Sequence, residues 1–408
     1  MKERRFGFRE ENLLSPEDAI AAFFAAVALR APQVELVALE DSYGRILGAS
    51  VYADRDYPDA PRSAMDGFAL ASDCVPGRLP ILGEIAMGLA WSGVLPRGSA
   101  LRIPTGGVVP RGADAVVPIE EASFDSFEVD VSHGIAVGDN VNPRAGDMPE
   151  GELVLNPGTR VGGPQLGVLA TLGITSVRVF RRPRIAVISS GDELIPPGDV
   201  PRIGQIRDSN RFAIAGSLRA TGAEVQHIPT AHDEPPALET ALADALEACD
   251  AVIVTGGSSV GDRDRTPDAI ATLGAPGTIV HGLRVKPGKP TVLAAVGSKP
   301  VIGLPGNPTS ALVILEAVAA PIIRALTGAE PRPEGLTAVL DAPVSGRPGW
   351  TWYVPVALRN EGATLVAHPL PLRSSMVSLT ARCDGYLTIG ERDEEFAAGT
   401  SVHIRRFA

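Results

Sequence analysis

Cysteine is scarce in this chain, and the three that occur are far apart: Cys74, Cys249 and Cys383. No CxxC spacing is present, and the number of cysteines is odd. A structural zinc site needs closely spaced ligands, and a disulfide framework needs cysteines in pairs. We therefore expect neither, and we expect the three thiols to be small buried or half-buried side chains.

An excess of positive charge is also missing, because 37 basic residues are outnumbered by 48 acidic ones and the formal net charge is −11. Non-specific binding to nucleic acid or to an anionic membrane depends on surface cations. The composition therefore argues against nucleic acid and membrane partners. It does not exclude an anionic small ligand, which a few local lysines or the start of a helix can hold.

Long apolar runs are absent near the beginning of the chain. Residues 1–12 are highly charged, and Ala19–Leu29 is about half of the roughly 20 residues that a membrane span needs. We find no signal peptide, and we expect a soluble, cytoplasmic protein.

Apolar sequence is nevertheless plentiful, since 45% of the 408 residues are hydrophobic, and this length predicts two to four domains. Ser15 followed by Pro16 and two acids predicts a helix that starts here and runs to about Leu29. From Val51 to about Glu150, short apolar runs separated by turn residues predict an all-β insert. Those runs are Ala100–Ile103, Ala115–Ile119 and Phe127–Val131, and a helical pattern returns at Gly163–Leu172.

From Arg184 the pattern changes to apolar strands that alternate with helices. The strands are expected at Arg184–Ser189, Glu224–Ile228, Ala251–Thr255, Ile279–Val285, Thr291–Val296 and Val301–Leu304. The helices are expected at Phe212–Ala220, Pro236–Glu247, Pro267–Leu273 and Thr309–Leu326. Strands that are apolar on both faces and alternate with helices predict a doubly wound parallel sheet. After a linker at Pro331–Gly335, residues 336–408 are β again, with alternation in Trp350–Leu358 and Tyr386–Ile389.

Small and polar residues follow several of these strands, at the edge of an open sheet where ligands bind. The loops are Ser189–Glu193, Thr255–Asp262, Lys286–Pro290 and Leu304–Ser310. Gly256 and Gly257 let backbone N–H groups approach a phosphate closely, and Lys286 and Lys289 offer ammonium donors to an oxyanion.

Two further features of these loops suit an anionic ligand. Thr309 and Ser310 begin a helix, whose first N–H groups attract anions. Glu193, Asp262 and Asp264 could hold Mg²⁺. Each loop alone is more often an ordinary turn, but four of them at strand ends of one sheet predict a small-anion or nucleotide site.

Several strings together resemble the molybdopterin molybdotransferase family, which is MoeA in bacteria and the E domain of gephyrin in animals. In the α/β region they are Ser189–Leu194 (SSGDEL), Gly256–Gly261 (GGSSVG), Lys286–Pro290 (KPGKP) and Leu304–Ala311 (LPGNPTSA). In the insert they are Ser63–Ala69 (SAMDGFA), Arg102–Gly107 and Gly112–Val117. The strings span nearly the whole chain in the family's order.

The resemblance implies a multidomain α/β plus β architecture. A split helical and β N-terminal domain would comprise 13–50 with 150–181, and a β-rich domain, 51–149, would be inserted into it. A molybdopterin-binding α/β domain would comprise 182–328, and a C-terminal β-barrel 329–408. The family forms homodimers with a cleft between the third domain of one subunit and the second domain of the other.

The family's reaction takes adenylylated molybdopterin and molybdate as substrates, releases AMP and leaves molybdenum cofactor, with Mg²⁺ as the divalent ion. The resemblance implies catalytic roles for Asp66, Thr105, Glu193 and Asp264, with Asp66 and Thr105 coming from the partner subunit. The substrate-binding residues would be Asp147, Asp233, Gly256, Gly257, Ser259, Lys286, Lys289, Pro305, Asn307 and Ser310. The metal ligands would be Glu193, Asp262 and Asp264. Molybdopterin adenylyltransferase and apo-molybdoenzymes are candidate partners.

The chain departs from the family pattern in a few places. Ser258 and Arg265 replace the usual valine and aromatic residue, and Asn142 and Ala145 stand where arginine and glycine are usual. Residues 350–356 lack the basic residue that the family often carries near molybdate. Two alternatives therefore stay open: a tungstate-inserting paralogue, and a non-catalytic molybdopterin-binding or scaffold protein. The intact polar residues at ligand positions argue against the scaffold.

Overall fold

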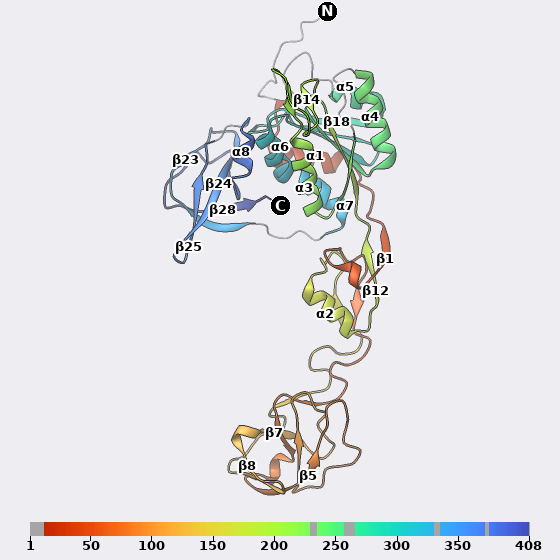
Figure 1. Ribbon diagram of the computed structural model, residues 1–408, viewed down its shortest axis with the longest axis vertical. Coiled ribbons are helices and arrows are strands. Elements are labelled where there is room, and N and C mark those ends of the chain that lie inside the picture. Colours follow the sequence, from red (N-terminus) through yellow and green to blue (C-terminus); the bar gives the residue numbers. More distant parts are fainter. Residues whose placement is uncertain (1–11, 229–234, 257–265, 330–334, 372–374, 408) are drawn as a thin grey trace, which may run out of the picture. The chain divides into compact units, whose positions relative to one another are not determined.

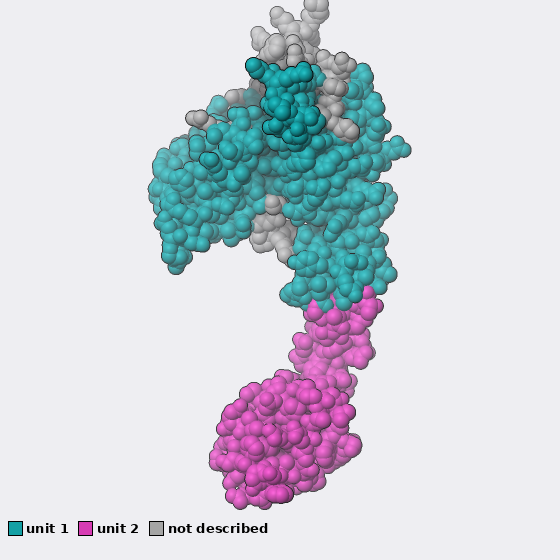
Figure 2. Space-filling view, in the orientation of Figure 1, with its two compact units in different colours: residues 1–48, 158–166, 176–408 teal, residues 49–157, 167–175 magenta. Residues whose placement is uncertain are grey.

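The computed structural model describes residues 12–228, 235–256, 266–329, 335–371 and 375–407 (Figure 1). The chain divides into two units, which Figure 2 distinguishes by colour. Unit 1 comprises residues 1–48, 158–166 and 176–408, and unit 2 comprises residues 49–157 and 167–175. The four domain boundaries expected from the sequence stay a prediction.

The α/β part of unit 1 is built on a six-stranded sheet with the order β16-β13-β17-β21-β20-β18. The strands are β13 (Arg184–Ser189), β16 (Glu224–His227), β17 (Ala251–Thr255), β18 (Pro276–His281), β20 (Val292–Val296) and β21 (Lys299–Leu304). The first four in spatial order are parallel, as the sequence predicted, whereas β20 runs antiparallel to both β21 and β18. Because β18 is thus parallel to β21, the carboxyl ends of β13, β17, β21 and β18 meet at one edge.

Both faces of this sheet are buried, which explains why its strands read as continuous apolar runs. In β13, Ile185 and Val187 pack with one core cluster, and Ala186 and Ile188 pack with another. The first cluster includes side chains of α1 (Pro16–Ala26), α3 (Asn210–Ala220) and α6 (Pro308–Ile314), and the second includes those of α4 (Pro235–Ala248) and α5 (Thr266–Leu273). Burying one such aliphatic side chain stabilises the folded state by about 1.5–3 kcal/mol. The many side chains buried between the sheet and its two layers of helices therefore stabilise the α/β part of unit 1.

Two predicted elements of unit 1 differ at their ends. Helix α1 ends at Ala26 rather than Leu29, because Val27 has extended backbone and turns its side chain into the core. The strand expected at Ile279–Val285 is interrupted: β18 ends at His281, Gly282 has a φ of 91°, and a separate strand β19 (Val285–Lys286) follows. Gly282 therefore redirects the chain before the lysine loop.

The predicted helix at Thr309–Leu326 is confirmed as a run from Pro308 to Thr327. It consists of α6, a π-helical segment η5 (Leu315–Ala319) and α7 (Ala320–Thr327). Pro321 follows the π segment and has no N–H to donate into the helix. The run is long and apolar enough to cross a membrane, but 78% of its most apolar window is buried inside the protein. It is therefore a core helix of unit 1.

The predicted C-terminal barrel is confirmed as a closed ring of five strands. In ring order these are β24 (Thr351–Glu361), β25 (Thr364–Pro369), β22 (Leu336–Leu340), β28 (Ser401–Arg406) and β26 (Gly385–Ile389), and β26 pairs with β24 to close the ring. Strand β19 of the α/β part adds to it, parallel to β24. Beside that junction Arg284 donates two hydrogen bonds to the carboxylate of Glu391, at 2.8 and 3.0 Å. Tyr353 and Tyr386 of the barrel belong to the α/β core cluster.

Unit 2 contains a second six-stranded sheet, with the order β7-β4-β6-β5-β9-β8, which confirms the β-rich insert. Its strands are β4 (Gly67–Leu70), β5 (Gly77–Glu84), β6 (Ala100–Ile103), β7 (Ala115–Pro118), β8 (Ser123–Phe124) and β9 (Glu128–Val131). Alternate residues of these strands face two apolar clusters, one around Phe68 and one around Leu101.

Shorter elements complete the described chain. Paired two-stranded ribbons are β1 (Val34–Ala38) with β12 (Ser176–Phe180), β2 (Val51–Tyr52) with β11 (Leu153–Leu155), β3 (Arg62–Ser63) with β10 (Val141–Asn142), β14 (Leu194–Ile195) with β15 (Ile206–Arg207), and β23 (Val344–Ser345) with β27 (Glu395–Phe396). The remaining helical elements are α2 (Gly163–Thr171), α8 (Val377–Thr380), η2 (Glu40–Ser42), η3 (Ser72–Cys74) and η4 (Ile119–Glu121).

Candidate functional site

A cavity of about 1390 Å³ opens at the carboxyl ends of the parallel strands in unit 1. Its wall includes residues from all four of the loops named from the sequence, among them the lysine loop, Lys286–Pro290. The sequence-predicted residues that line it are Glu193, Gly256, Lys286, Lys289, Pro305, Asn307 and Ser310. Gly257, Ser259, Asp262, Asp264 and Asp233, which were predicted to join them, lie outside the described residues.

Close backbone packing brings two of these loops together. Gly256 has a φ of 91°, and a Cβ atom there would lie 2.0 Å from the carbonyl oxygen of Ser190. Any other residue would force the loops after β13 and β17 apart. In the lysine loop, a Cβ at Gly288 would lie 2.2 Å from the Ile314 side chain, so this glycine seats the loop on α6.

Asn210, at the start of α3, is a cavity residue that sequence reasoning missed. Its side-chain Nδ2 donates to Oγ1 of Thr255 at 3.1 Å and to the carbonyl oxygen of Gly306 at 2.7 Å. One amide group therefore ties the end of β17 to the loop after β21. The string Asp208–Asn210 directly before a helical pattern was the available signal.

Among the described residues, three buried polar atoms of the cavity wall have no hydrogen-bond partner: Oγ of Ser189, Oδ2 of Asp208 and Nε1 of Trp352. Asp208 is 2% exposed; its Oδ1 accepts a hydrogen bond from the backbone N–H of Arg211 at 3.2 Å, and its Oδ2 lies 3.4 Å from Nε of Arg211. An unsatisfied buried polar atom costs about 1–3 kcal/mol. The carboxylate oxygen of Asp208 can accept a hydrogen bond from a polar ligand group, the indole N–H of Trp352 can donate one, and the hydroxyl of Ser189 can do either.

One side of the cavity is lined by basic and indole side chains. Nζ of Lys286 lies 4.1 Å from the ring centroid of Trp352, and Nζ of Lys289 lies 5.8 Å from that of Trp350. Residues 350–356 carry no base, as the sequence indicated, but Arg347 lines the cavity, and its Cζ lies 5.1 Å from the Trp350 centroid. This wall favours an anion.

The carboxylate of Glu193 also lines the cavity, and the residue is exposed. Within the described parts of the chain, no three His, Cys, Asp or Glu side chains form a group that could hold a metal. Mg²⁺ commonly uses only one or two protein carboxylates together with waters and substrate phosphates. The donor chemistry of Glu193 therefore fits such an ion.

The predicted residues Asp66 and Thr105 lie in unit 2 and are bonded to each other. The backbone N–H and the hydroxyl of Thr105 donate to Oδ1 of Asp66 at 2.7 and 3.0 Å. These bonds, the backbone one first, hold the pKa of the Asp66 carboxyl below its usual value. Asp66 is therefore an ionised, exposed carboxylate at neutral pH.

Asp147 lines a separate cavity of about 790 Å³ in unit 2, together with Gly106, the residue after Thr105. Asn142 also lines it, and Arg62 spans its wall by donating to the carbonyl oxygen of Gly106 at 3.0 Å. Ala145 has a φ of 58°. That left-handed backbone is strained for alanine, at a cost of roughly 1–2 kcal/mol.

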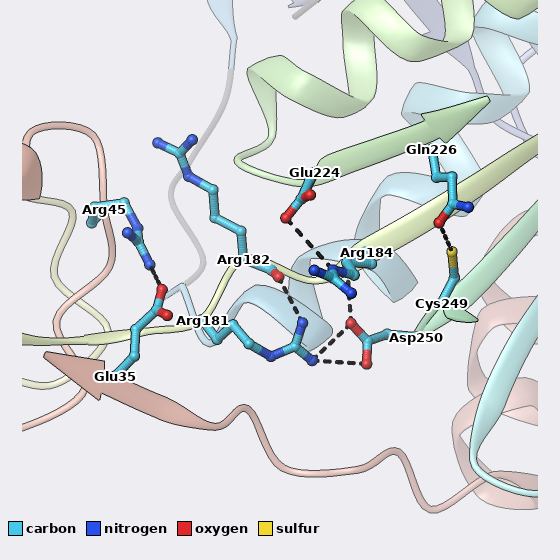
Figure 3. Close-up of polar contacts among 9 residues, drawn as sticks. All are labelled: Glu35, Arg45, Arg181, Arg182, Arg184, Glu224, Gln226, Cys249 and Asp250. Carbon is cyan, nitrogen blue, oxygen red and sulfur yellow. Dashed lines mark hydrogen bonds and ion pairs between the residues drawn. The ribbon is translucent and has the colours of Figure 1, made fainter. Parts of the chain in front are cut away.

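At the opposite edge of the α/β sheet, where the strands begin, polar groups satisfy one another (Figure 3). Nη2 of Arg181 donates to both carboxylate oxygens of Asp250 at 2.9 Å, and the backbone N–H of Arg184 donates to Asp250 at 2.8 Å. Nearby, Sγ of Cys249 donates to Gln226 at 3.2 Å, and burial raises the pKa of that thiol. Cys249 is thus a buried thiol, as expected.

Comparison with known proteins finds three family models along the chain. The MoeA N-terminal region (domain I and II) matches residues 14–173, the probable molybdopterin binding domain matches 186–325, and the MoeA C-terminal region (domain IV) matches 337–407.

Similar whole proteins are also known. A molybdopterin molybdenumtransferase from Synechocystis is 33% identical over 374 residues, covering 88% of this chain and 92% of that protein. One from Bacillus subtilis is 32% identical over 386 residues, covering 91% and 89%. The crystal structure of a molybdopterin biosynthesis MoeA protein from Pyrococcus horikosii superposes with a TM-score of 0.79 at 30% identity, covering 97% of this chain and 99% of that one.

Proposed function

The chain belongs to the MoeA family and is a transferase of molybdenum cofactor biosynthesis, and we propose that it inserts molybdate into adenylylated molybdopterin with release of AMP. Molybdate would supply the metal, and cleavage of the adenylate would make the insertion effectively irreversible. The proposed reaction centre is the cavity at the carboxyl edge of the α/β sheet in unit 1.

The observation that carries this proposal is the basic wall of that cavity. Molybdate is a dianion, and the pyrophosphate link of the adenylate is also anionic, so bringing them together costs Coulomb repulsion. Lys286 and Lys289 face the same cavity and can offset that repulsion. Its volume of about 1390 Å³ also exceeds the roughly 300–1,000 Å³ of ordinary small-ligand pockets, which suits two substrates.

Each cavity residue then has a stated task. The ammonium groups of Lys286 and Lys289 and the hydroxyl of Ser310 would bind the oxyanion and phosphate oxygens. The backbone at Gly256, which has no side chain of its own, would lie against the substrate. Pro305 and Asn307 would shape the same wall, and the orphaned atoms of Ser189 and Asp208 would bind polar groups of the pterin or the ribose.

We propose that Glu193 holds Mg²⁺, with Asp262 and Asp264 as further ligands and Asp264 also acting in catalysis. When bound, the ion would supply positive charge to the phosphate oxygens of the substrate. Gly257, Ser259 and Asp233 remain proposed substrate contacts.

We also propose that the enzyme is a homodimer whose two protomers share each reaction centre. Asp66, Thr105 and Asp147 belong to unit 2, whereas the lysines belong to unit 1. In this proposal the unit 2 residues of one protomer serve the cavity of the other. The ionised carboxylate of Asp66, aligned by Thr105, would orient a donor group of the substrate.

The experiment that tests the function is a measurement of AMP release from adenylylated molybdopterin with Mg²⁺, with molybdate or tungstate added in turn. AMP release that depends on molybdate supports the proposal, and the two oxyanions are ranked by their rates. Tight binding of the adenylate with no AMP release under either oxyanion would instead support a binding protein.

The shared centre is tested by mixing two inactive variants, Lys286→Gln and Asp66→Asn. If protomers share a site, a mixed dimer has one intact centre of two. Random pairing of equal amounts makes half of the dimers mixed, so activity returns to roughly a quarter of the wild-type rate. If each protomer uses its own residues, the mixture stays inactive.

A further inference from the structure

The basic wall of the cavity contains more than the two lysines named from the sequence. Three positively charged groups lie against two indole rings: Lys286 against Trp352, and both Lys289 and Arg347 against Trp350. All five side chains line the same cavity. The Lys289 ammonium and the Arg347 guanidinium can be no farther apart than the sum of their distances to the Trp350 centroid, 5.8 and 5.1 Å.

Backbone pairing, rather than side-chain rotation alone, sets this arrangement. Strand β19 runs parallel to β24, and its register places Lys286 directly beside Trp352. The backbone N–H of Thr351 donates to the carbonyl oxygen of Arg284 at 3.1 Å, which extends the same pairing. The pairing of β19 with β24 therefore holds the indole ring of Trp352 beside the lysine loop.

The electrostatics of this wall favour a small, highly charged anion. An indole face attracts a cation, by about 0.5–2 kcal/mol depending on exposure, and so restrains the flexible lysine and arginine side chains. A bound oxyanion would be attracted by all three positive charges, and a planar guanidinium can donate two parallel hydrogen bonds to it.

We propose that Arg347 is the third cation of the oxyanion site and that Trp350 and Trp352 are positioning residues that hold the three cations. The ligand class is a tetrahedral dianion of the molybdate type. This inference rests on the proposed function, since it assumes that Lys286 and Lys289 bind the oxyanion. The Trp352 face that carries the Lys286 ammonium is occupied, which argues against stacking of a substrate ring on it.

The test is the binding of molybdate alone to the full-length protein, measured by isothermal titration calorimetry and by tryptophan fluorescence. The chain has three tryptophans, and the third, Trp91, lies in unit 2. A Trp91→Phe background therefore leaves only the two cavity indoles as reporters. The variants are Arg347→Gln and Arg347→Lys. The matched control is Arg359→Gln, on strand β24, whose guanidinium is paired with Asp341 and Glu361 away from the cavity.

We expect Arg347→Gln to raise the Kd for molybdate roughly tenfold or more. Arg347→Lys should recover part of the loss because it keeps the charge, and Arg359→Gln should bind as the parent protein does. Trp352→Leu should weaken binding several-fold, whereas Trp352→Phe, which keeps a ring face, should weaken it less. Molybdate should also change the indole fluorescence of the parent.

Unchanged affinity in Arg347→Gln, when Lys286→Gln has lost binding, would remove Arg347 from the site. Equal losses in Arg347→Gln and Arg359→Gln would show damage to the barrel and would also overturn the inference. If Lys286→Gln binds molybdate normally, the lysine assignment within the proposed function fails first. Equal binding by Trp352→Leu and the parent would overturn the role of the indoles.

Discussion

The two edges of the parallel sheet in unit 1 have different chemistry, although the same strands run between them. At the carboxyl edge, the strand-end loops leave a large cavity, and buried polar atoms of Ser189 and Asp208 have no hydrogen-bond partner. At the amino edge, Asp250 is bonded to the Arg181 guanidinium and to the N–H of Arg184 (Figure 3). One edge is open to a ligand, and the other is satisfied within the protein.

This difference separates charged residues that serve a ligand from those that serve the fold. A charged group whose hydrogen bonds are complete within the protein contributes to the free energy of unfolding. A cation that faces a cavity beside other cations contributes little to folding and much to anion binding. Substitutions at the carboxyl edge should therefore slow turnover with little change in stability. Substitutions at the amino edge should lower stability with little change in turnover per folded molecule.

The largest effect is expected for Lys286→Gln, which removes a cation from the cavity wall. The rate of AMP release should fall by at least about a hundredfold, as when a preorganised donor to a developing anion is removed, with little change in the denaturation midpoint. The control is Lys299→Gln, because Lys299 lies where β21 begins and its ammonium donates to the carbonyl oxygen of Leu246. If Lys299→Gln slows AMP release as much as Lys286→Gln does, the claim that only the carboxyl edge serves turnover is wrong.

At the amino edge, Asp250→Ala should destabilise the fold instead. It leaves Arg181 and the N–H of Arg184 without their acceptor, and we expect a loss of about 2 kcal/mol in the free energy of unfolding, measured by urea denaturation. AMP release per folded molecule should stay near the wild-type rate. Glu224→Ala is the control, since its Arg184 pair is 3.8 Å long and both side chains are more than half exposed, 56% and 62%. Glu224→Ala should lower the free energy of unfolding by only about 0–1 kcal/mol.

A smaller effect on turnover is expected for Asn210→Ala. The substitution removes the amide that ties Thr255 to Gly306, so the loops after β17 and β21 should lose their alignment. We expect kcat/KM for AMP release to fall about tenfold, because small misplacements of binding groups are costly. Asn210→Asp keeps the shape but loses the donor and should be no better. Full activity in both variants would remove Asn210 from the cavity's architecture.

The smallest effect concerns unit 2, where Ala145 has left-handed backbone. Ala145→Gly should stabilise this unit by up to about 1 kcal/mol, because glycine adopts a positive φ without strain. Ala122→Gly, at an extended position with a φ of −123°, should instead destabilise it by roughly 0.5–1 kcal/mol. Trp91 fluorescence during denaturation reports on this unit. A loss of stability in Ala145→Gly would show that the backbone strain is compensated elsewhere.

Local pattern was sufficient for most elements. The apolar runs at Arg184–Ser189 and Ala251–Thr255 are strands with the predicted bounds, because a buried parallel strand needs apolar residues on both faces. The strand expected at Ile279–Val285 was only partly right, since Gly282 breaks it and Val285 pairs with the barrel. Periodicity does not reveal which distant strand a short segment pairs with.

The candidate site was predictable where its residues form motifs and not where they meet through folding. Lys286, Lys289 and Gly256 stand in strings that resemble the family, and they line one cavity. Asn210 and Arg347 stand in no such string, and they reach the cavity from the start of a helix and from the barrel. Their contribution depends on contacts with Thr255, Gly306 and Trp350, which only the folded chain contains.

The sequence by itself determined the family, the alternation of strands and helices, and the location of chemistry after the strands, because these depend on residue type and spacing along the chain. The tertiary structure decided which charges are satisfied and which face a cavity. It also placed Lys286 beside Trp352 and left Oδ2 of Asp208 buried without a hydrogen bond. Hydrogen bonding and Coulomb interactions act over a few ångströms in space, and distance along the chain does not report that separation.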